Sequence, residues 1–261
     1  MADKSGIQVI ARAAAILRAL ESARSHPSLG ELAATVGLPK STVQRIVKSL
    51  CDERLLASDP PGSGIRLGPA LLRLAAATPF ALERALRPFL QELCNDVQET
   101  IDLSVLQGKS AVFIDQVPGP SRLTVVSAPG KSYPLHCTAN GKAMLACLTP
   151  EQRRGLLAGR LARHTAATPT DPDAIESQVA DFQRRPLAVD REEHTDGICA
   201  VGTGFIDASG TPWAISVPVP STRFEQKRGY ISRRLLETRA QILRGIPECH
   251  AAPAPRRASR G

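Results

Sequence analysis

Two short helix patterns and a turn-rich hairpin pattern follow one another between Ser28 and Gly68, and this order constrains the fold more than any other feature of the chain. Ser28 and Glu31 have the spacing of a capping box, in which each side chain accepts a hydrogen bond from the backbone amide of the other residue. A helix is therefore expected to begin near Leu29, and Gly37 supplies the left-handed residue that ends it. Local signals thus bound the first helix at both ends.

A second helix pattern begins at Pro39 and extends to about residue 53. Its apolar residues recur at i, i+3, i+4 and i+7, which places them on one face: Val43, Ile46, Val47 and Leu50. The N-terminal half and the opposite face carry hydroxyl, amide and basic groups, which contact base edges and phosphates in protein–DNA complexes. Gln44 and Arg45 are the best candidates for contacting bases. Taken alone, such a face is more often simply solvated.

Two short apolar runs, 55–58 and 65–67, flank a turn rich in Pro and Gly and predict a β-hairpin. Two helices and a hairpin in this order predict a winged helix-turn-helix, whose second helix enters the major groove of DNA. The wing would lie along the sugar-phosphate backbone, with Arg66 as its expected contact, although a single Arg in a strand is more often solvated. The candidate DNA-contacting residues are Ser28, Lys40, Ser41, Thr42, Gln44, Arg45, Lys48 and Arg66.

The length and charge of the chain agree with two domains, one of which binds an acidic polymer. The chain has 261 residues and a formal net charge of +8, and this length exceeds that of one average domain. Residues 1–78 hold ten basic and six acidic side chains, which is half of the net positive charge. The expected limits are 1–69 for a DNA-binding domain, 70–79 for a linker helix, 80–247 for a distal domain and 248–261 for a disordered, Ala- and Pro-rich tail.

The six cysteines, at positions 51, 94, 137, 147, 199 and 249, are scattered without a CxxC pair. This spacing favours neither disulfides nor a zinc site, and no cofactor is expected. Arg12 and Arg18 interrupt the N-terminal apolar segment, which is typical of an amphipathic helix and not of a signal sequence. No apolar run reaches the length of a membrane span, so a reducing cytoplasm is the expected location.

Beyond residue 70 the pattern alternates between helices and strands. A helix-forming run at 71–77 stops before a Thr-Pro pair and is interpreted as a linker helix, with an ordinary packing helix as the alternative. Helical periodicity marks 82–97, 141–148, 173–185 and 223–243, and strand-like runs mark 101–106, 111–117, 123–127, 198–206 and 213–219. Adjacent strands mixed with helices predict an α/β (α+β) domain with a mainly antiparallel sheet.

Motifs in a fixed order over more than two hundred residues give the chain a family resemblance. They are Arg12-Ala13, Leu29 to Ala33, Gly37 to Arg45, Arg66 to Gly68, Pro134 to Thr138, Gly141 to Ala143, Asp190 to His194 and Gly197 to Val201, ending near Arg223. Through these motifs the chain resembles IclR-type transcriptional regulators. Arg54 stands where a glycine often precedes the wing in that family, and Ile65 replaces a common aromatic residue.

The resemblance implies a transcriptional regulator, more commonly a repressor, whose distal domain is GAF-like and binds an effector. A homodimer or a dimer of dimers on a pseudo-palindromic operator is expected, because one small DNA-binding domain makes few contacts. The effector-contacting positions implied by the resemblance are Leu123, Ala139, Asn140, Asp190, Ala200 and Ser216. The segment from Thr138 to Lys142 leads from a loop into a helix, where free backbone N–H groups suit a carboxylate, so a small organic acid is the expected effector.

Two other functions are open to these residues. Cys137 or Cys199 could serve as a redox sensor, but nothing in the sequence identifies a depressed thiol pKa or a resolving partner. A thiol nucleophile with a histidine base could form from His136 and Cys137, or from His194 and Cys199. Adjacent residues on a strand point to opposite faces, however, and no third group is evident to orient the base. The sequence therefore assigns no catalytic residue and no metal ligand, and we expect that the chain is not an enzyme.

Overall fold

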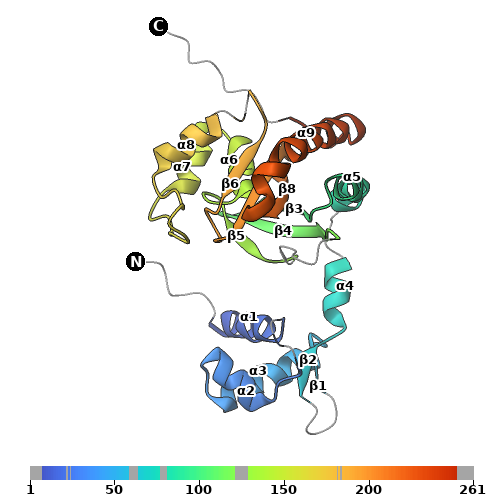
Figure 1. The fold of residues 1–261 in the computed structure, drawn as a ribbon. Helices are drawn as coiled ribbons and strands as arrows, with labels where there is room; N and C mark the ends of the chain where they lie inside the picture. The colour runs from blue at the N-terminus through green and yellow to red at the C-terminus, as the bar shows by residue number, and fades with distance from the viewer. Residues whose placement is uncertain are drawn as a thin grey trace. The chain divides into compact units, whose positions relative to one another are not determined.

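The computed structural model describes residues 8–21, 23, 25–58, 64–76, 81–120, 129–180, 182 and 184–251. The chain divides into two compact units, Met1–Pro79 and Phe80–Gly261, which we call the N-terminal and C-terminal units (Figure 1). Within the described ranges, none of the helices combines the length and the apolar composition that crossing a bilayer requires.

The N-terminal unit is the expected winged helix-turn-helix. Its elements are α1 (Gln8–Glu21), α2 (Leu29–Val36), α3 (Lys40–Asp52), β1 (Leu56–Ser58), β2 (Ile65–Leu67) and α4 (Ala70–Ala76). The two strands pair antiparallel, as the hairpin pattern predicted. Residues 59–63 of the expected turn lie outside the described part of the chain, and so do residues 77–80, which follow α4.

The capping box at the start of α2 is present as predicted. The Ser28 hydroxyl accepts a hydrogen bond from the Glu31 amide at 3.3 Å, and a Glu31 carboxylate oxygen accepts one from the Ser28 amide at 2.8 Å. Gly37 ends the helix with a φ of 66°. The apolar stripe of α3 is buried against α1, α2 and the hairpin, in a core that contains Ile16, Leu20, Leu32, Val43, Ile46, Val47, Leu50, Leu56 and Ile65. Local signals and apolar periodicity therefore suffice to build this unit.

The backbone conformation of Arg54 explains why glycine often precedes the wing in the family that this chain resembles. Its φ of 58° lies in the left-handed region that favours glycine. Its carbonyl oxygen accepts a hydrogen bond from the amide of Ala70, at the start of α4. The left-handed turn at Arg54 therefore helps to join the end of α3 to the beginning of α4.

The C-terminal unit is built on one six-stranded sheet with the order β5-β4-β3-β8-β7-β6, in which all described pairs are antiparallel. The strands are β3 (Ile101–Gln107), β4 (Ser110–Val117), β5 (Ser132–Pro134), β6 (Ala188–Arg191), β7 (Ile198–Ile206) and β8 (Pro212–Pro220). The helices are α5 (Ala81–Val97), α6 (Ala139–Ala146), α7 (Pro150–Leu157), α8 (Pro172–Ala180) and α9 (Ser221–Gly245).

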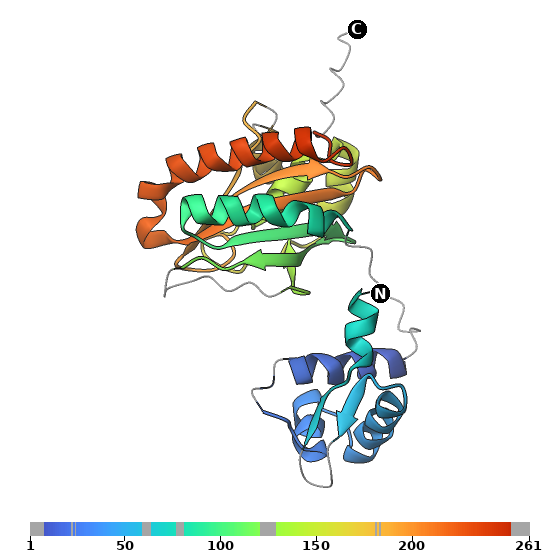
Figure 2. The ribbon, with the colours of Figure 1, turned by 90° about the vertical axis from the view of Figure 1, so that its right-hand side faces the viewer.

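Helices cover both faces of this sheet (Figures 1 and 2). On one face α5 and α9 pack against the alternate apolar residues of β3, β7 and β8 in the largest core, which includes Leu90, Leu103, Val201, Ile215 and Leu235. On the other face α6 and α8 enclose a second core that includes Ala143, Met144, Ile175 and Ala214. Burial of both faces explains why β7 and β8 are almost uniformly apolar.

Several predicted boundaries differ from the structure. The helix expected over 173–185 ends at Ala180, and Arg184 and Arg185 are not helical; Pro186 disfavours the α conformation at Arg185, the residue before it. The strands β5 and β6 and the helix α7 were not predicted, although α7 has its own capping box between Thr149 and Gln152. The predicted strand 123–127 lies outside the described residues.

The folded C-terminal unit extends beyond residue 247, where the tail was expected to begin. Cys249 is buried, and the backbone of His250 pairs with that of Ile206 through two hydrogen bonds of 2.9 and 2.8 Å. Disorder is therefore the wrong expectation for residues 248–250, because β7 offers them backbone partners that the local sequence does not reveal. Residues 252–261 lie outside the described part of the chain.

Two glycines of β7 allow α6 to lie close to the sheet. A Cβ atom at Gly202 would lie 2.9 Å from the Ala139 carbonyl oxygen, and one at Gly204 would lie 2.6 Å from the Ala143 carbonyl oxygen. Both distances are shorter than real Cβ contacts, and the obstacle is helix backbone that cannot rotate away. Glycine at these two positions therefore sets how close α6 comes to β7.

We expect Gly204→Ala to destabilise the protein, because the added methyl group must push α6 away from the sheet. Overpacking of this kind costs about 1–3 kcal/mol in the free energy of unfolding. Gly155→Ala is the matched control, since Gly155 lies in α7 with open space around it and alanine is the better helix former there. Urea denaturation of both variants would measure the difference, and equal stability of Gly204→Ala and the wild type would contradict the close packing of α6.

Candidate DNA interface and ligand pocket

Helix α3 presents six of the eight candidate DNA-contacting residues on its surface. Five of them are exposed, and Thr42 is half-buried. No side chain caps the helix at Pro39, so the first amides of α3 remain available at its positive end. Ser28 is exposed at the start of α2, where its hydroxyl accepts the capping hydrogen bond, and Arg66 is exposed on β2.

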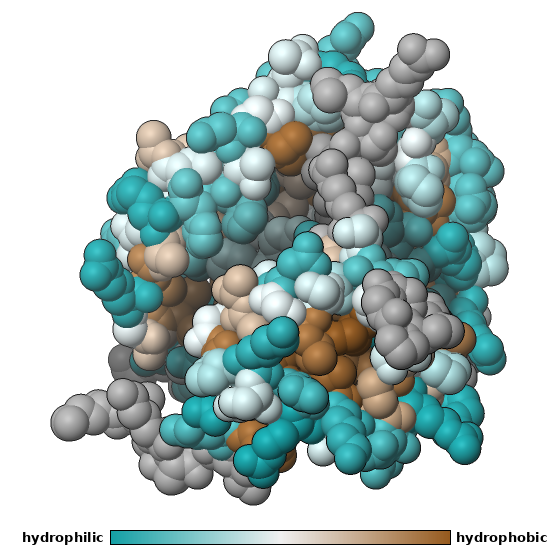
Figure 3. All heavy atoms as spheres, turned by 90° about the horizontal axis from the view of Figure 1, so that it is seen from below, coloured by the Kyte–Doolittle hydropathy of each residue, from teal (hydrophilic) through white to brown (hydrophobic). Residues whose placement is uncertain are grey.

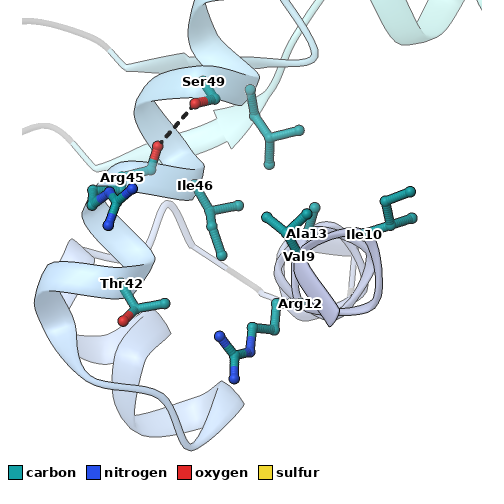
Figure 4. Close-up of a pocket in the computed structure, with 9 residues that line it drawn as sticks. Val9, Ile10, Arg12, Ala13, Thr42, Arg45, Ile46 and Ser49 are labelled. Carbon is teal, nitrogen blue, oxygen red and sulfur yellow. Dashed lines mark hydrogen bonds between the residues drawn. The ribbon is translucent and has the colours of Figure 1, made fainter. Parts of the chain in front are cut away.

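A groove of about 390 Å³ runs between α1 and α3 beside these residues. Figure 4 shows Arg12 extending from α1 on one side, and Thr42 and Arg45 on α3 at the other. Sequence reasoning did not select Arg12 as a DNA-contacting candidate, although an exposed arginine within a largely apolar helix is a usable signal. The groove therefore places a further basic side chain beside the candidate recognition helix.

Apart from Arg12, the residues of α1 that line the groove are apolar. Val9 is 53% exposed and Ile10 is 64% exposed, and both line the groove. Figure 3, seen from below, shows hydrophobic surface in brown bordered by hydrophilic side chains. Because it is open and has few polar groups that converge, this groove lacks the features of a small-molecule site.

A second cavity, of about 240 Å³, lies in the C-terminal unit on the face of the sheet covered by α6. Its lining residues come from all six strands, from the N-terminal end of α6 and from the segment after β6: Asp102, Phe113, Tyr133, Thr138, Ala139, Asn140, Asp190, His194, Thr195, Ile198, Ala200, Ser216 and Pro218. We call this cavity the ligand pocket. Five of the six predicted effector positions line it, and the sixth, Leu123, lies outside the described residues.

The strand register explains how residues far apart in the sequence meet in the ligand pocket. Asp190 of β6 is paired with Ala200 of β7, which is paired with Pro218 of β8. Two residues earlier on β8, Ser216 is paired with Asp102 of β3. Side chains of paired residues share a face of the sheet, so the two rows form one wall of the pocket.

Asn140 is the most unusual polar group of the ligand pocket. The side chain is 1% exposed, and neither its amide nitrogen nor its amide oxygen has a hydrogen-bond partner. Thr138, in contrast, is satisfied, because its hydroxyl caps α6 by accepting a hydrogen bond from the Gly141 amide at 3.1 Å. A buried amide without partners costs about 1–3 kcal/mol, so a bound polar molecule would gain by pairing with it.

Asp190 adds a carboxyl group to the same wall. One of its oxygens accepts a hydrogen bond from the Glu193 amide at 2.8 Å. Burial is the largest cause that raises the pKa of Asp190 to about 7, and the nearby Glu193 carboxylate adds to it, whereas Lys142 acts in the opposite direction. Near neutral pH this group therefore interconverts between a neutral donor and an anion.

Several lining residues were missed by sequence reasoning. Asp102 is a buried acid inside a mostly apolar strand, which is a signal that could have identified it. Phe113, Tyr133 and His194 carry no such local signal. Their rings pack in sequence, Phe113 against Tyr133 with centroids 4.6 Å apart and Tyr133 against His194 at 5.2 Å.

The cysteine-based alternatives find no support in the site. All six cysteines are free thiols. Burial raises the pKa of Cys137 to about 12 and also raises the pKa of Cys199, so neither is an activated thiolate. The His136 Nε2 atom is hydrogen bonded to the Ala162 carbonyl oxygen at 2.9 Å, which leaves that nitrogen unable to act as a base toward a thiol.

Comparison with known proteins agrees with this arrangement over both units. Residues 9–60 match the family described as "IclR helix-turn-helix domain", and residues 75–244 match "Bacterial transcriptional regulator IclR C-terminal". The chain is 45% identical to the HTH-type transcriptional regulator Rv1719 of Mycobacterium tuberculosis over 231 residues. This alignment covers 88% of this chain and 89% of that protein. It is 35% identical to the HTH-type transcriptional regulator TtgV of Pseudomonas putida, with 92% of each chain covered.

Solved structures show the same architecture. The crystal structure of the Thermotoga maritima IclR aligns with a TM-score of 0.75 at 25% identity, and the match covers 92% of this chain and 98% of that one. The family comprises transcription regulators and not enzymes. With both family matches in chain order and together covering most of its length, the chain belongs to the IclR family of DNA-binding transcriptional regulators and has an effector-binding C-terminal domain.

Proposed function

We propose that this regulator binds a pseudo-palindromic operator as a homodimer or a dimer of dimers and represses transcription. The DNA contacts are made by the eight candidate residues, which lie at the N-cap of α2, in α3 and on β2, from Ser28 to Arg66, and Arg12 adds a phosphate contact. Arg45 and Gln44 are exposed on the α3 face opposite the buried stripe, which supports their contact with bases. Repression is supported by the 27% identity to proteins named HTH-type transcriptional repressor AllR. The site of action is the cytoplasm, where the operator DNA lies.

The effector in this proposal is a small organic acid that occupies the ligand pocket. The observation that carries it is the buried Asn140 amide without partners, at the N-terminal end of α6. The helix end favours the carboxylate, and Ala139, Ala200 and Ser216 shape the remaining contacts. An IclR homolog from Microbacterium hydrocarbonoxydans, 21% identical to this chain, was crystallised in complex with 4-hydroxybenzoate. We use that compound as one probe in a screen of carboxylic acids.

Ligand control requires that the effector favour one of two states of the protein. The shift can be no larger than the difference in its affinity for those states. We propose that residues 70–79, which include α4, connect a DNA-binding domain of residues 1–69 to an effector-binding domain that begins at residue 80. Arg54 and Ala70 join this connector to the helix-turn-helix by a 3.1 Å backbone hydrogen bond.

Replacement of Arg45 tests the DNA-binding assignment. We expect Arg45→Ala to weaken binding to a genomic fragment selected by the wild-type protein by about ten- to a hundredfold, because one base contact is worth about 1–3 kcal/mol. Fluorescence anisotropy at fixed salt would measure the affinity, and footprinting should show two half-sites. Arg160→Ala, an exposed arginine of the C-terminal unit, removes the same charge and should leave specific affinity unchanged. Equal affinity of Arg45→Ala and wild type would reject the assignment.

Replacement of Asn140 tests the ligand pocket. Asn140→Leu removes the unpaired amide with little change in volume, so the free energy of unfolding without ligand should rise by up to about 1–3 kcal/mol. The same variant should lose the increase in melting temperature that a carboxylic acid gives the wild type, while its DNA affinity without ligand stays unchanged. Asn95→Leu, at an exposed position of α5, is the control. A ligand-induced shift that persists in Asn140→Leu would remove this residue from the site.

The affinity for an organic acid should depend on pH through Asp190. Below its pKa of about 7 the carboxyl is neutral and can donate a hydrogen bond to the ligand, whereas above it two anions meet. We expect the affinity to fall as pH rises from about 6 to about 8, by at most about tenfold per unit above the pKa. Asp190→Asn should flatten the pH profile measured by calorimetry, because it removes the carboxyl that changes charge. The variant keeps the other charged and titratable groups near the pocket, which are Glu193, Lys142, His194 and Asp102. An unchanged slope in that variant would assign the pH dependence to another group.

A further inference from the structure

Three of the five histidines of the chain gather with a cysteine beside the ligand pocket. The ligand atoms of His136, Cys137 and His164 all lie within 4.8 Å of one another. His194 extends the group, since its ring centroid is 4.8 Å from that of His164. Neither the proposed DNA contacts nor the proposed effector contacts use His136, Cys137 or His164.

The surroundings of His136 leave one ring nitrogen available. Its Nε2 atom lies 2.9 Å from the Ala162 carbonyl oxygen, so Nε2 carries the proton and donates it to that oxygen. Nδ1 is then the nitrogen with the free lone pair. Metal-bound histidines are commonly held in this way, with the other ring nitrogen donating to a backbone carbonyl. The hydrogen bond therefore fixes both the tautomer and the orientation that a ligand needs.

The loop between α7 and α8 holds His164 in place. The His164 amide donates to the Thr168 hydroxyl oxygen at 3.0 Å, and that hydroxyl donates to the Glu193 carbonyl oxygen at 2.6 Å. The Thr165 hydroxyl donates to the Glu192 carbonyl oxygen at 2.6 Å. The backbone at His164 is thus fixed to the segment after β6, while its side chain remains exposed to solvent.

From this juxtaposition we propose that His136, Cys137 and His164 bind one late first-row divalent transition metal ion, with Zn²⁺ as the best match. Two imidazoles and one thiolate are the ligands that Zn²⁺ prefers, and a site with three protein ligands leaves the fourth position open to water. The ion would link the exposed loop that carries His164 to the buried segment that precedes α6.

The distances are compatible with a site that closes on the ion. In a tetrahedral Zn²⁺ site the ligand atoms are about 3.5 Å apart, given bond lengths of about 2.0–2.3 Å. A closure of roughly 1 Å from the present separation is within the range of side-chain rotation, chiefly at the exposed His164. The charged groups nearest the cluster include Asp190, Glu193 and Lys142, and Glu193 is paired with Lys142 at 2.6 Å.

Metal titration of the full chain tests the proposal. Protein that has been reduced and freed of metal with a chelator is titrated with Zn²⁺ in two buffers of different ionisation enthalpy. We expect one ion per chain, a higher melting temperature, and release of a proton as the Cys137 thiol becomes a thiolate bound to the metal. With Co²⁺ as the probe, the same site should give a thiolate-to-cobalt charge-transfer band in the near ultraviolet.

Two variants and two controls locate the ion. His164→Ala changes an exposed side chain, so the fold should persist, and the affinity for Zn²⁺ should fall by at least about tenfold. Cys137→Ser should abolish the cobalt charge-transfer band. His26→Ala and Cys51→Ser, both in the N-terminal unit, should change neither result. The proposal is overturned if wild type shows no saturable binding, or if correctly folded His164→Ala binds Zn²⁺ as the wild type does.

Discussion

A buried lysine in the C-terminal unit holds together the segments on which the ligand pocket depends. Lys142 of α6 is 2% exposed, and its Nζ atom lies 2.6 Å from both carboxylate oxygens of Glu193 and 2.8 Å from the Gln178 amide oxygen. It also donates to the Val189 carbonyl oxygen. Removing one partner of a buried ion pair costs roughly 3–5 kcal/mol, because the other charge is left without compensation. This one ammonium group therefore fixes α6 against α8 and β6.

The polar groups that face the pocket follow from this constraint. Asn140 lies two residues before Lys142, so the anchor that fixes α6 also holds the Asn140 amide where the fold gives it no partner. Asp190 lies three residues before Glu193 and accepts its amide hydrogen bond, so the ion pair positions that carboxyl as well. The glycines of β7 allow the close approach of α6 that completes the wall. The segments around α6 are thus held together as a frame for the pocket, and the Asn140 amide and the Asp190 carboxyl line its interior.

The sequence predicted those parts of the structure that depend on local signals. The capping box at Ser28, the left-handed Gly37 and the apolar stripe of α3 each lie within a few residues, and all three are present. Features that depend on distant partners were missed, such as β6, the pairing of His250 with β7, and the approach of His164 to residues 27 or more positions away. The sequence itself indicated a carboxylate site only at the helix start of residues 138–142, and the strand positions of the pocket were predicted through the family resemblance, because strand register cannot be derived from periodicity alone.

Hydrogen–deuterium exchange of the full chain, with and without a carboxylic acid that raises its melting temperature, tests most directly whether the ligand occupies the frame around α6. We predict slower exchange in the peptides that contain residues 138–142 and 190–200, because the ligand would pair with Asn140 and order the wall built by β6 and β7. Slower exchange confined to the groove between α1 and α3, with no change at α6, would contradict this assignment.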